Sequence, residues 1–493
     1  MLVLPITIPL GTAILGLLSL RFHRLHRAIS VFGSVALLLA SIVLFRNVWR
    51  EGILASTLGN WPAPFGITLV VDHLSALMVV ITAITGLAVT VYSLGSISAD
   101  RQRGGFYALL NVLLVGVNGS FVTGDLFNLY VWFEVMLIAS FALLVLGGEK
   151  TQLRGGIQYV LINLVSSASL LTAIALTYGL TGSLNMADVA VRLADVEQTG
   201  LVTAIAMLFM VAFGIKAALF PLFFWLPVSY YTAPPAVGAV FAGLLTKVGV
   251  YALVRTFTLM FVHDVGYTHQ ILLVASGLTM LTGVLGAAIQ YDIRKILGFH
   301  IISQIGYMIM GLALFTRLAL VGTVFYIAHH IIVKANLFLL GGAIERTAGS
   351  FDLNKIGGLY RSRPGLAMLF LIPAFSLAGF PPLSGFWAKM IVIKASLDAG
   401  SYAIAAVALV VSALTIFSMT KIWALGFWKP HPGGDEAIAK PSVGLMIAPI
   451  AGLAILTVLI GLLPESLYQL ADRAAGELLD PSAYVSAVMG RQP

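Results

Sequence analysis

Cysteine is absent from this chain of 493 residues, and charged residues make up only 10% of it. Without cysteine the protein forms no disulfide, no thiolate metal site and no catalytic thiol. Soluble domains carry about 25% charged residues, whereas 59% of this chain is hydrophobic, more than a water-soluble fold can bury. The composition therefore predicts a polytopic membrane protein, in which the net charge of +8 is an orientation signal rather than a sign of nucleic-acid binding.

Signals of soluble catalysis are also missing. No loop is long enough for a soluble domain, and there is no phosphate-binding glycine loop, metal-spaced cluster of His, Asp and Glu, or nucleophile elbow. We therefore expect neither an enzyme nor a cofactor or metal site. The N-terminal stretch MLVLPITIPLGTAILGLLSL lacks a basic start and a small-residue cleavage site, so we interpret it as a first membrane span.

Long apolar runs give the expected number of membrane crossings. A spanning helix needs about 20 mostly apolar residues, and about fourteen runs meet that need. We therefore expect an all-α polytopic membrane fold. The runs cover residues 2–20, 29–48, 68–95, 106–123, 126–147, 157–180, 202–226, 235–259, 269–290, 296–315, 318–342, 366–396, 402–427 and 443–463.

Loop charges predict the orientation of the chain. Alternate loops are rich in Lys and Arg, whereas the loop 181–200 carries Asp188, Asp195 and Glu197 against a single Arg192. Basic loops stay in the cytoplasm, which places both termini outside, as an even number of crossings requires. The basic segments are 21–27, 100–103, 149–154, 292–295 and 345–363.

Several ionisable residues lie inside the apolar runs, where a charge costs about 2.5–3.5 kcal/mol. A lysine near a helix end can reach the surface along its flexible side chain, which suits Lys394 and Lys421 but not Lys247. One buried charge can also be a structural partner of a neighbouring helix. A row of lysines with a carboxylate, however, is typical of a proton relay. The candidate relay residues are Glu134, Lys216, Lys247, His330, Lys334 and Lys389.

His330 and Lys334 lie one helical turn apart and share a face, which favours a relay role for His330. Histidine is the side chain most readily protonated and deprotonated near pH 7. His329 is rotated from this face by about 100°, and both a relay role and a packing role are open for it. We therefore treat His329 as a possible relay residue.

Two runs, 202–226 and 366–396, are longer than one span and contain prolines. Proline breaks a helix, and in lipid the freed backbone groups must be satisfied inside the protein. Each break has a lysine nearby, and the two broken helices, the seventh and the twelfth, are five helices apart, which gives them opposite directions. Inverted repeats of transporters show this pattern. We expect one transmembrane domain over 1–493, with leading helices (1–105), a first repeat of helices 4–8 (106–259), a second repeat of helices 9–13 (269–427) and a last helix (443–463).

These segments resemble the antiporter-like family shared by the proton-pumping membrane subunits of respiratory complex I and the large subunits of Mrp-type Na+/H+ antiporters. The resemblance covers nearly the whole chain and is closest to the D-type Mrp subunits. The length suits that type, without the long C-terminal extension of the A type, and Lys389 and His300 occupy positions that agree with it. The segments are VDHLSAL (71–77), FNLYVWFE (127–134), DIRKILGFHIISQIGYM (292–308), HHIIVKANLF (329–338) and GFPPLSGFWAK (379–389), with the lysines of the seventh and eighth helices.

The resemblance implies a role for each relay residue. Glu134 would pair with Lys216 and tune its proton affinity, and Lys247 would accept the proton next. The histidine and lysine of the eleventh helix would form a central bridge, and Lys389 would be the terminal site, connected to one membrane face. The implied partners are membrane subunits of the A, B, C, E, F and G types in a bacterial cytoplasmic membrane. Because no carboxylate-rich sodium site is visible, we expect this chain to carry protons and sodium to cross elsewhere.

Three further polar residues have structural alternatives. Asp72 and Asp125 each precede an expected helix and are interpreted as N-caps, although Asp72 stays a possible relay residue. Asp125 lies about two and a half turns before Glu134, on a nearly opposite face, so the two form no carboxylate pair. His300, near the cytoplasmic end of its helix, is either a proton-uptake group or a surface histidine.

Three other functions stay open beside a proton-conducting antiporter subunit. The second possibility is the homologous pump module of a redox-driven complex, such as an NADH dehydrogenase or a membrane hydrogenase, with the electron chemistry in other subunits. A stand-alone solute transporter predicts a roomy polar pocket rather than a row of lysines. A structural scaffold gives no reason to retain buried lysines at their insertion cost.

Overall fold

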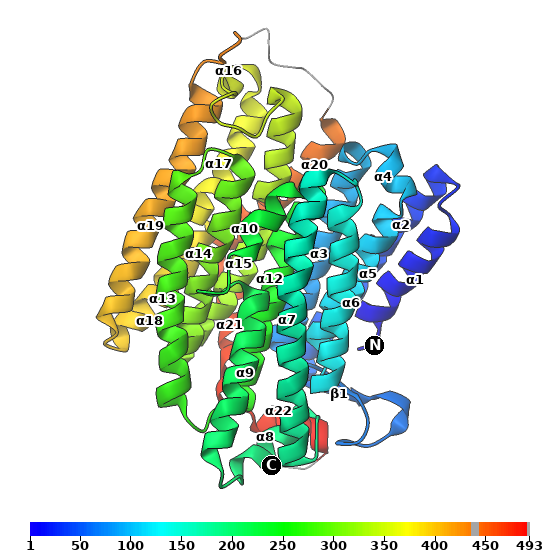
Figure 1. The fold of residues 1–493 in the computed structure, drawn as a ribbon, viewed down its shortest axis with the longest axis vertical. Helices are drawn as coiled ribbons and strands as arrows, with labels where there is room; N and C mark the ends of the chain where they lie inside the picture. The colour runs from blue at the N-terminus through cyan, green and yellow to red at the C-terminus, as the bar shows by residue number, and fades with distance from the viewer. Residues whose placement is uncertain (435–442, 491–493) are drawn as a thin grey trace.

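The computed structural model describes residues 1–434 and 443–490. Over these residues the chain forms a tall bundle of helices that run along one common direction (Figure 1). Eleven of the described helices are long and apolar enough to cross a membrane, and three shorter apolar helices accompany them. The all-α membrane fold is confirmed, whereas the number of fourteen crossings stays a prediction.

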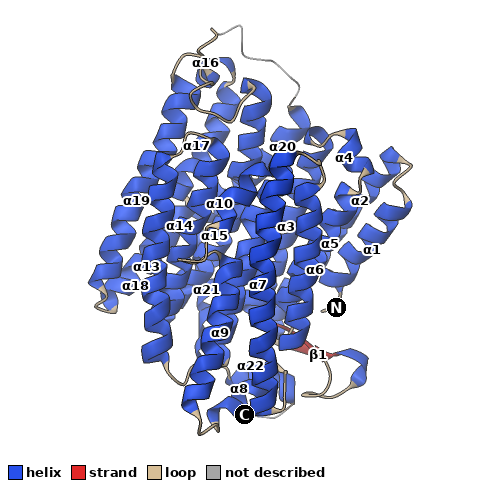
Figure 2. Ribbon diagram, in the orientation of Figure 1, coloured by secondary structure: helices blue, strands red, loops and turns tan. Residues whose placement is uncertain are grey.

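The leading part of the chain forms three long helices, two short helical segments and a β-hairpin. They are α1 (Leu4–Leu18), α2 (His23–Glu51), β1 (Leu54–Thr57), η1 (Leu58–Asn60), β2 (Thr68–Val71), α3 (His73–Ser96) and α4 (Ala99–Arg103). The two strands pair antiparallel, with Leu54 opposite Val71. This hairpin lies at the end of the bundle where the C-terminus also lies, and α4 lies at the other end (Figure 2).

The expected first repeat contains the first broken helix. Its elements are α5 (Phe106–Val122), α6 (Leu126–Val145), α7 (Lys150–Thr181), α8 (Met186–Ala194), α9 (Thr199–Ala217), α10 (Trp225–Ser229), η2 (Tyr230–Thr232), α11 (Pro235–Val240), η3 (Phe241–Leu245) and α12 (Thr246–Leu259). α11, η3 and α12 form one buried helix, in which η3 is a π-helical turn. A π-turn inserted in an α-helix often marks a functional site.

The expected second repeat is arranged around one long helix. Its elements are α13 (Val265–Ile289), α14 (Ile293–Leu314), α15 (Arg317–Ala348), α16 (Leu359–Ser362), α17 (Pro364–Ala378), α18 (Ser384–Asp398), α19 (Tyr402–Trp423) and η4 (Ala424–Trp428). α15 lies in the middle of the bundle (Figure 1), and nearly all its side chains are buried. A helix buried on every side accounts for its apolar residues on every face.

The last part of the described chain contains α20 (Gly444–Leu462), which was expected, and two helices that were not. α21 (Pro464–Leu479) and α22 (Ser482–Met489) follow it. α21 is amphipathic, with one buried apolar face and several charges. Its run is therefore not apolar enough to be predicted as a membrane span.

Both predicted breaks are confirmed. α9 ends where Ala218 takes a left-handed backbone with φ 63°, and Pro221 follows before α10 begins. α17 ends at Gly379, with φ 96°, and Pro381 and Pro382 follow before α18 begins. Glycine adopts this conformation without strain and alanine does so rarely.

Two isolated β-bridges relate the two halves of the chain. Asp125, at the start of α6, pairs antiparallel with Asn185, at the start of α8. Asp292, at the start of α14, pairs antiparallel with Asp352, which follows α15. The first bridge lies at the end of the bundle with α8, and the second lies at the end with α16 (Figure 1). This placement agrees with the expected inverted arrangement.

Candidate functional site

Glu134 and Lys216 meet through a serine rather than directly. Lys216 is buried, and its ammonium donates a hydrogen bond to Ser167 Oγ of α7 at 3.4 Å. The Ser167 hydroxyl donates in turn to Glu134 Oε1 of α6. The Phe133 ring lies 5.5 Å from Lys216 Nζ, within the range of a cation–π contact. The expected ion pair is therefore a carboxylate and an ammonium bridged by a hydroxyl.

The position of Lys216 follows from the break that ends α9. A Cβ atom at Gly249 of α12 would lie 2.6 Å from the Ala217 nitrogen, so only glycine lets α12 approach the break this closely. The freed backbone groups are satisfied inside the protein. Phe220 N–H donates to Thr279 Oγ1 at 2.9 Å, and Trp225 Nε1 donates to the Ile215 carbonyl at 3.0 Å.

Lys247 lies next to the π-helical turn of the same helix. Its side chain is fully buried, and its ammonium donates to the Ala242 carbonyl at 2.5 Å and to Thr246 Oγ1 at 3.2 Å. Both acceptors are neutral. Lys247 forms no ion pair with any carboxylate of the described residues. Lys247 therefore has two hydrogen-bond acceptors but no negatively charged partner among the described residues.

His330 and Lys334 share a face of α15, as predicted. Lys334 Nζ donates to the Leu297 carbonyl of α14 at 3.1 Å. Neither ring nitrogen of His330 has a hydrogen-bond partner among the described residues, although the ring is fully buried. His330 thus offers two nitrogen atoms without a hydrogen-bond partner among the described residues.

His329 points to the second break instead. Its Nδ1 lies 2.8 Å from Ser384 Oγ at the start of α18, and Ser384 Oγ lies 3.0 Å from Ser376 Oγ of α17. A Cβ atom at Gly385 would lie 2.9 Å from the His329 ring and would also collide with the Ser376 carbonyl. His329 therefore packs tightly against the broken helix, and its possible relay role stays a prediction.

Lys389 lies beyond the second break and opens to a groove. Its ammonium donates to the carbonyl of Ala378, the last residue of α17, at 3.0 Å and lies 5.4 Å from the centre of the Tyr307 ring. A groove of about 540 Å³ between α18 and α19 contains this lysine and extends to Lys394 and Asp398, which form an ion pair at 2.5 Å. Lys389 is thus buried but lines a groove of the molecule.

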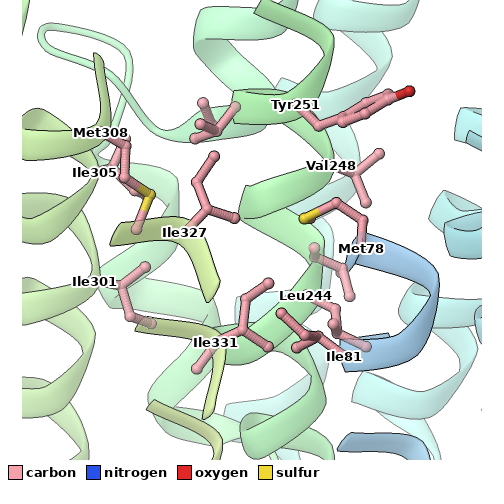
Figure 3. Close-up of a cluster of buried hydrophobic side chains, with 14 of the residues drawn as sticks. Met78, Ile81, Leu244, Val248, Tyr251, Ile301, Ile305, Met308, Ile327 and Ile331 are labelled. Carbon is pink, nitrogen blue, oxygen red and sulfur yellow. The ribbon is translucent and has the colours of Figure 1, made fainter. Parts of the chain in front are cut away.

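An apolar cluster accompanies the central residues (Figure 3). Side chains of α3, η3, α12, α14 and α15 meet there. The polar groups form separate hydrogen-bonded sets rather than one continuous chain among the described residues. One set joins Glu134 to Lys216, and another joins His329 to Ser376. The cluster includes Met78, Ile81, Leu244, Val248, Tyr251, Ile301, Ile305, Met308, Ile327 and Ile331.

His300 and Asp72 lie outside the row of lysines. The surface alternative for His300 is wrong, because the ring is fully buried and its Nε2 lies 2.5 Å from Ser418 Oγ of α19. The N-cap interpretation of Asp72 is confirmed by its bond from the Ser75 amide at 2.8 Å. Asp125 caps α6 in the same way, through the Asn128 amide at 2.7 Å.

Arg255 was not predicted from the sequence. It lies two turns after Lys247 on the same face of α12 and forms a buried ion pair with Asp72. Its guanidinium also lies over the rings of Tyr251 and Tyr484. The spacing of Lys247 and Arg255 was a usable signal, but an arginine this near a helix end resembles one that reaches the surface.

Elsewhere in the described part of the chain, no three His, Asp or Glu side chains converge as a metal site would require.

Known proteins share both this sequence and this arrangement. The family described as "NADH:quinone oxidoreductase/Mrp antiporter, TM" matches residues 123–415. The D subunit of the Na(+)/H(+) antiporter of Alkalihalophilus pseudofirmus is 49% identical over 487 residues, which cover 99% of both chains. A chain of the Mrp complex from Dietzia sp. DQ12-45-1b is 35% identical, covers 99% of each chain and has a TM-score of 0.92. A chain of respiratory complex I from Thermus thermophilus is 27% identical over 97% of this chain and 100% of that chain, with a TM-score of 0.84.

Proposed function

Because the chain belongs to the transmembrane family of NADH:quinone oxidoreductase and Mrp antiporter subunits, we propose that it is the proton-translocating D-type subunit of a multisubunit Na+/H+ antiporter. The observation that carries this proposal is the series of ionisable side chains across the bundle, which are buried except for the partly buried Glu134. They come from five helices, α6, α9, α12, α15 and α18. Ionisable groups inside a membrane are expensive and usually mark an ion pathway.

The proton passes along the series from the first half to the second. Glu134 acts on Lys216 through the Ser167 hydroxyl, which can donate to the carboxylate and accept from the ammonium at the same time. Lys247 follows on α12, and His330 on α15 comes next, with two ring nitrogen atoms that have no hydrogen-bond partner among the described residues. Lys389 is the terminal site, because its groove leads away from the centre of the bundle.

The orientation and the repeats are part of the same proposal. The end with α4 and α16 lies in the cytoplasm and both termini lie outside, in a bacterial cytoplasmic membrane, because the Lys- and Arg-rich loops lie at that end. Residues 106–259 and 269–427 are the two inverted repeats, and the two β-bridges at opposite ends support this division.

The partners are the other membrane subunits of the antiporter, of the A, B, C, E, F and G types. The redox-driven alternative has weaker support, because the relative from the antiporter is 49% identical and the complex I chain is 27% identical. In either setting the chain is an ion-transport subunit. Under this proposal sodium crosses elsewhere in the complex.

The test is cation-driven proton movement in inverted vesicles from an antiporter-deficient host that expresses the whole gene cluster. Wild type is compared with Lys216→Ala and Glu134→Ala, with assembly of the complex measured in parallel. We expect a sodium-dependent proton movement that both variants lose while they still assemble. Lys355→Ala, which removes an exposed lysine, is the matched control and should retain the activity.

Two outcomes would contradict parts of the proposal. A wild type without any response to sodium would favour the redox-driven complex. Full activity in both variants would mean that the bridged pair is structural and that protons take another route.

A further inference from the structure

A pocket lies at the end of the bundle that carries α4 and α16, away from the row of relay residues. It has a volume of about 390 Å³ and lies between α7, the broken-helix segment α10 and the start of α14. Polar and aromatic side chains line it, and two of them are basic. They include Thr151, Arg154, Tyr231, Gln290, Lys295 and Phe299.

The two basic side chains of this pocket have no acidic partner among the described residues. Arg294, next to Lys295, differs in this respect, because it forms an ion pair with Asp292 at 2.8 Å. Arg154 forms no such pair, and the Lys295 ammonium lies 4.9 Å from the centre of the Tyr231 ring. The pocket therefore holds two positive charges, and a concave site lined by one sign of charge attracts a ligand of the opposite sign.

The same charges argue against a path for cations. A positive pocket lowers the local concentration of hydronium and sodium ions, so it is unsuited to proton or sodium uptake. An anion with several oxygen acceptors fits the donors present: a guanidinium, an ammonium, a hydroxyl and a carboxamide. A phosphate group has this chemistry.

The surroundings identify the source of the phosphate. Ile157 on α7, Phe224 just before α10 and Ile289 at the end of α13 are 58%, 55% and 71% exposed. Each lies close in sequence to a residue of the pocket and toward the apolar part of its run. Exposed apolar side chains below a basic pocket, at the cytoplasmic end of membrane helices, are suited to acyl chains below a charged head group.

We propose that this pocket binds the phosphate of an anionic phospholipid, whose acyl chains lie along α7, α10 and α13. The bound lipid touches Pro227 and Val228 of the broken helix. Trp225 of the same segment holds the end of α9 through the Ile215 carbonyl, so the lipid rests on the element that positions Lys216. This site goes beyond the proposed transport function and rests on the orientation proposed with it.

The test uses the assembled complex in detergent and a photoactivatable phosphatidylglycerol. We expect the probe to label segments 154–164, 219–231 and 285–299, mapped by mass spectrometry. Unlabelled dioleoyl phosphatidylglycerol should compete at least about tenfold better than dioleoyl phosphatidylcholine, which carries no net charge. Arg154→Gln with Lys295→Gln should weaken binding on the order of thirtyfold, because each juxtamembrane charge contributes about fivefold.

The control removes the same charge at the same end of the bundle. Lys355→Gln with Arg361→Gln changes two exposed residues outside the pocket and should leave the labelling unchanged. If the double pocket variant fails to assemble, each single variant should still show about a fivefold loss.

Three results would overturn the proposal. Unchanged labelling in the assembled pocket variants would place the lipid elsewhere. Competition by inorganic phosphate as effective as that by the lipid would make the pocket a site for free anions. A crosslink from Lys295 to a partner subunit, with no lipid labelling, would show that protein fills it.

Discussion

The two broken helices are built alike but surround their lysines differently. In the first half, Lys216 lies just before the break and reaches a carboxylate through one hydroxyl, that of Ser167. In the second half, Lys389 lies just after the break and bonds to Ala378, a backbone carbonyl of the break itself. The first ammonium thus faces a full negative charge and the second faces only a dipole.

This difference suggests different tasks for the two lysines. An ammonium held by a carboxylate responds strongly when that carboxylate changes its charge or position. An ammonium that is hydrogen-bonded to a carbonyl beside an open groove can lose its proton without leaving an unpaired carboxylate in the protein. The first half is therefore suited to sensing charge and the second to releasing protons, and the following substitutions test that comparison.

The largest effect is expected from the terminal lysine. Lys389→Ala should reduce cation-driven proton movement at least about tenfold, as much as Lys216→Ala, because a serial pathway fails wherever it is interrupted. The measurement is proton movement in inverted vesicles, normalised to the amount of assembled complex. If Lys389→Ala retained more than half of the activity, the two halves would not form one pathway, and their difference would have no functional meaning.

The close packing of both breaks is tested by adding single methyl groups. Gly385→Ala would collide with the Ser376 carbonyl, and Gly249→Ala would approach the Ala217 nitrogen to 2.6 Å. Overpacking of this kind costs about 1–3 kcal/mol, so both variants should lower the melting temperature of the complex. Gly214→Ala is the control, because its Cβ would meet only side-chain atoms, the nearest at 3.7 Å. An unchanged melting temperature for Gly385→Ala would show that the residues around the second break shift to accept the methyl group more readily than those around the first.

Features that belong to a single helix could be predicted from the sequence. Features that depend on the packing of two or more helices could not. A lysine such as Lys247 stands out in an apolar run because of its insertion cost, and the prolines of both breaks act on their own backbone. Ser167 could not be singled out, because a serine in a helix usually bonds to its own backbone and only the packing of α6, α7 and α9 places it between two charges. The buried state of His300 likewise depends on α19, far away in the chain.

The role of the serine bridge is tested against a serine at the other break. Ser167→Ala removes the hydroxyl between the carboxylate and the ammonium and should reduce transport about threefold to tenfold, the effect of one lost hydrogen bond. Ser384→Ala, which removes a contact with His329 and Ser376 but with no carboxylate, should have a smaller effect. Ser167→Thr keeps a hydroxyl and should restore most of the activity. Equal effects of Ser167→Ala and Ser384→Ala would remove the distinction between the two sites.

The smallest expected effect lies at the outer ends of the two halves. The first half has the buried pair Asp72–Arg255, whereas in the second half Arg317 bonds to Asp472 of α21 with side chains 62% and 37% exposed.

Hydrogen bonds from Arg317 lower the pKa of Asp472. Its contribution is therefore present above the unfolded-state value of about 3.9 and is lost as the pH falls through the lower folded value. Exposed pairs contribute at most about 1 kcal/mol, so Asp472→Asn should lower the melting temperature slightly at pH 7 and by progressively less as the pH falls below about 3.9. Glu465→Gln, on the same helix but without an ion pair, should show no such difference. A loss of the same size at every pH would mean that Asp472 acts through packing rather than through its charge.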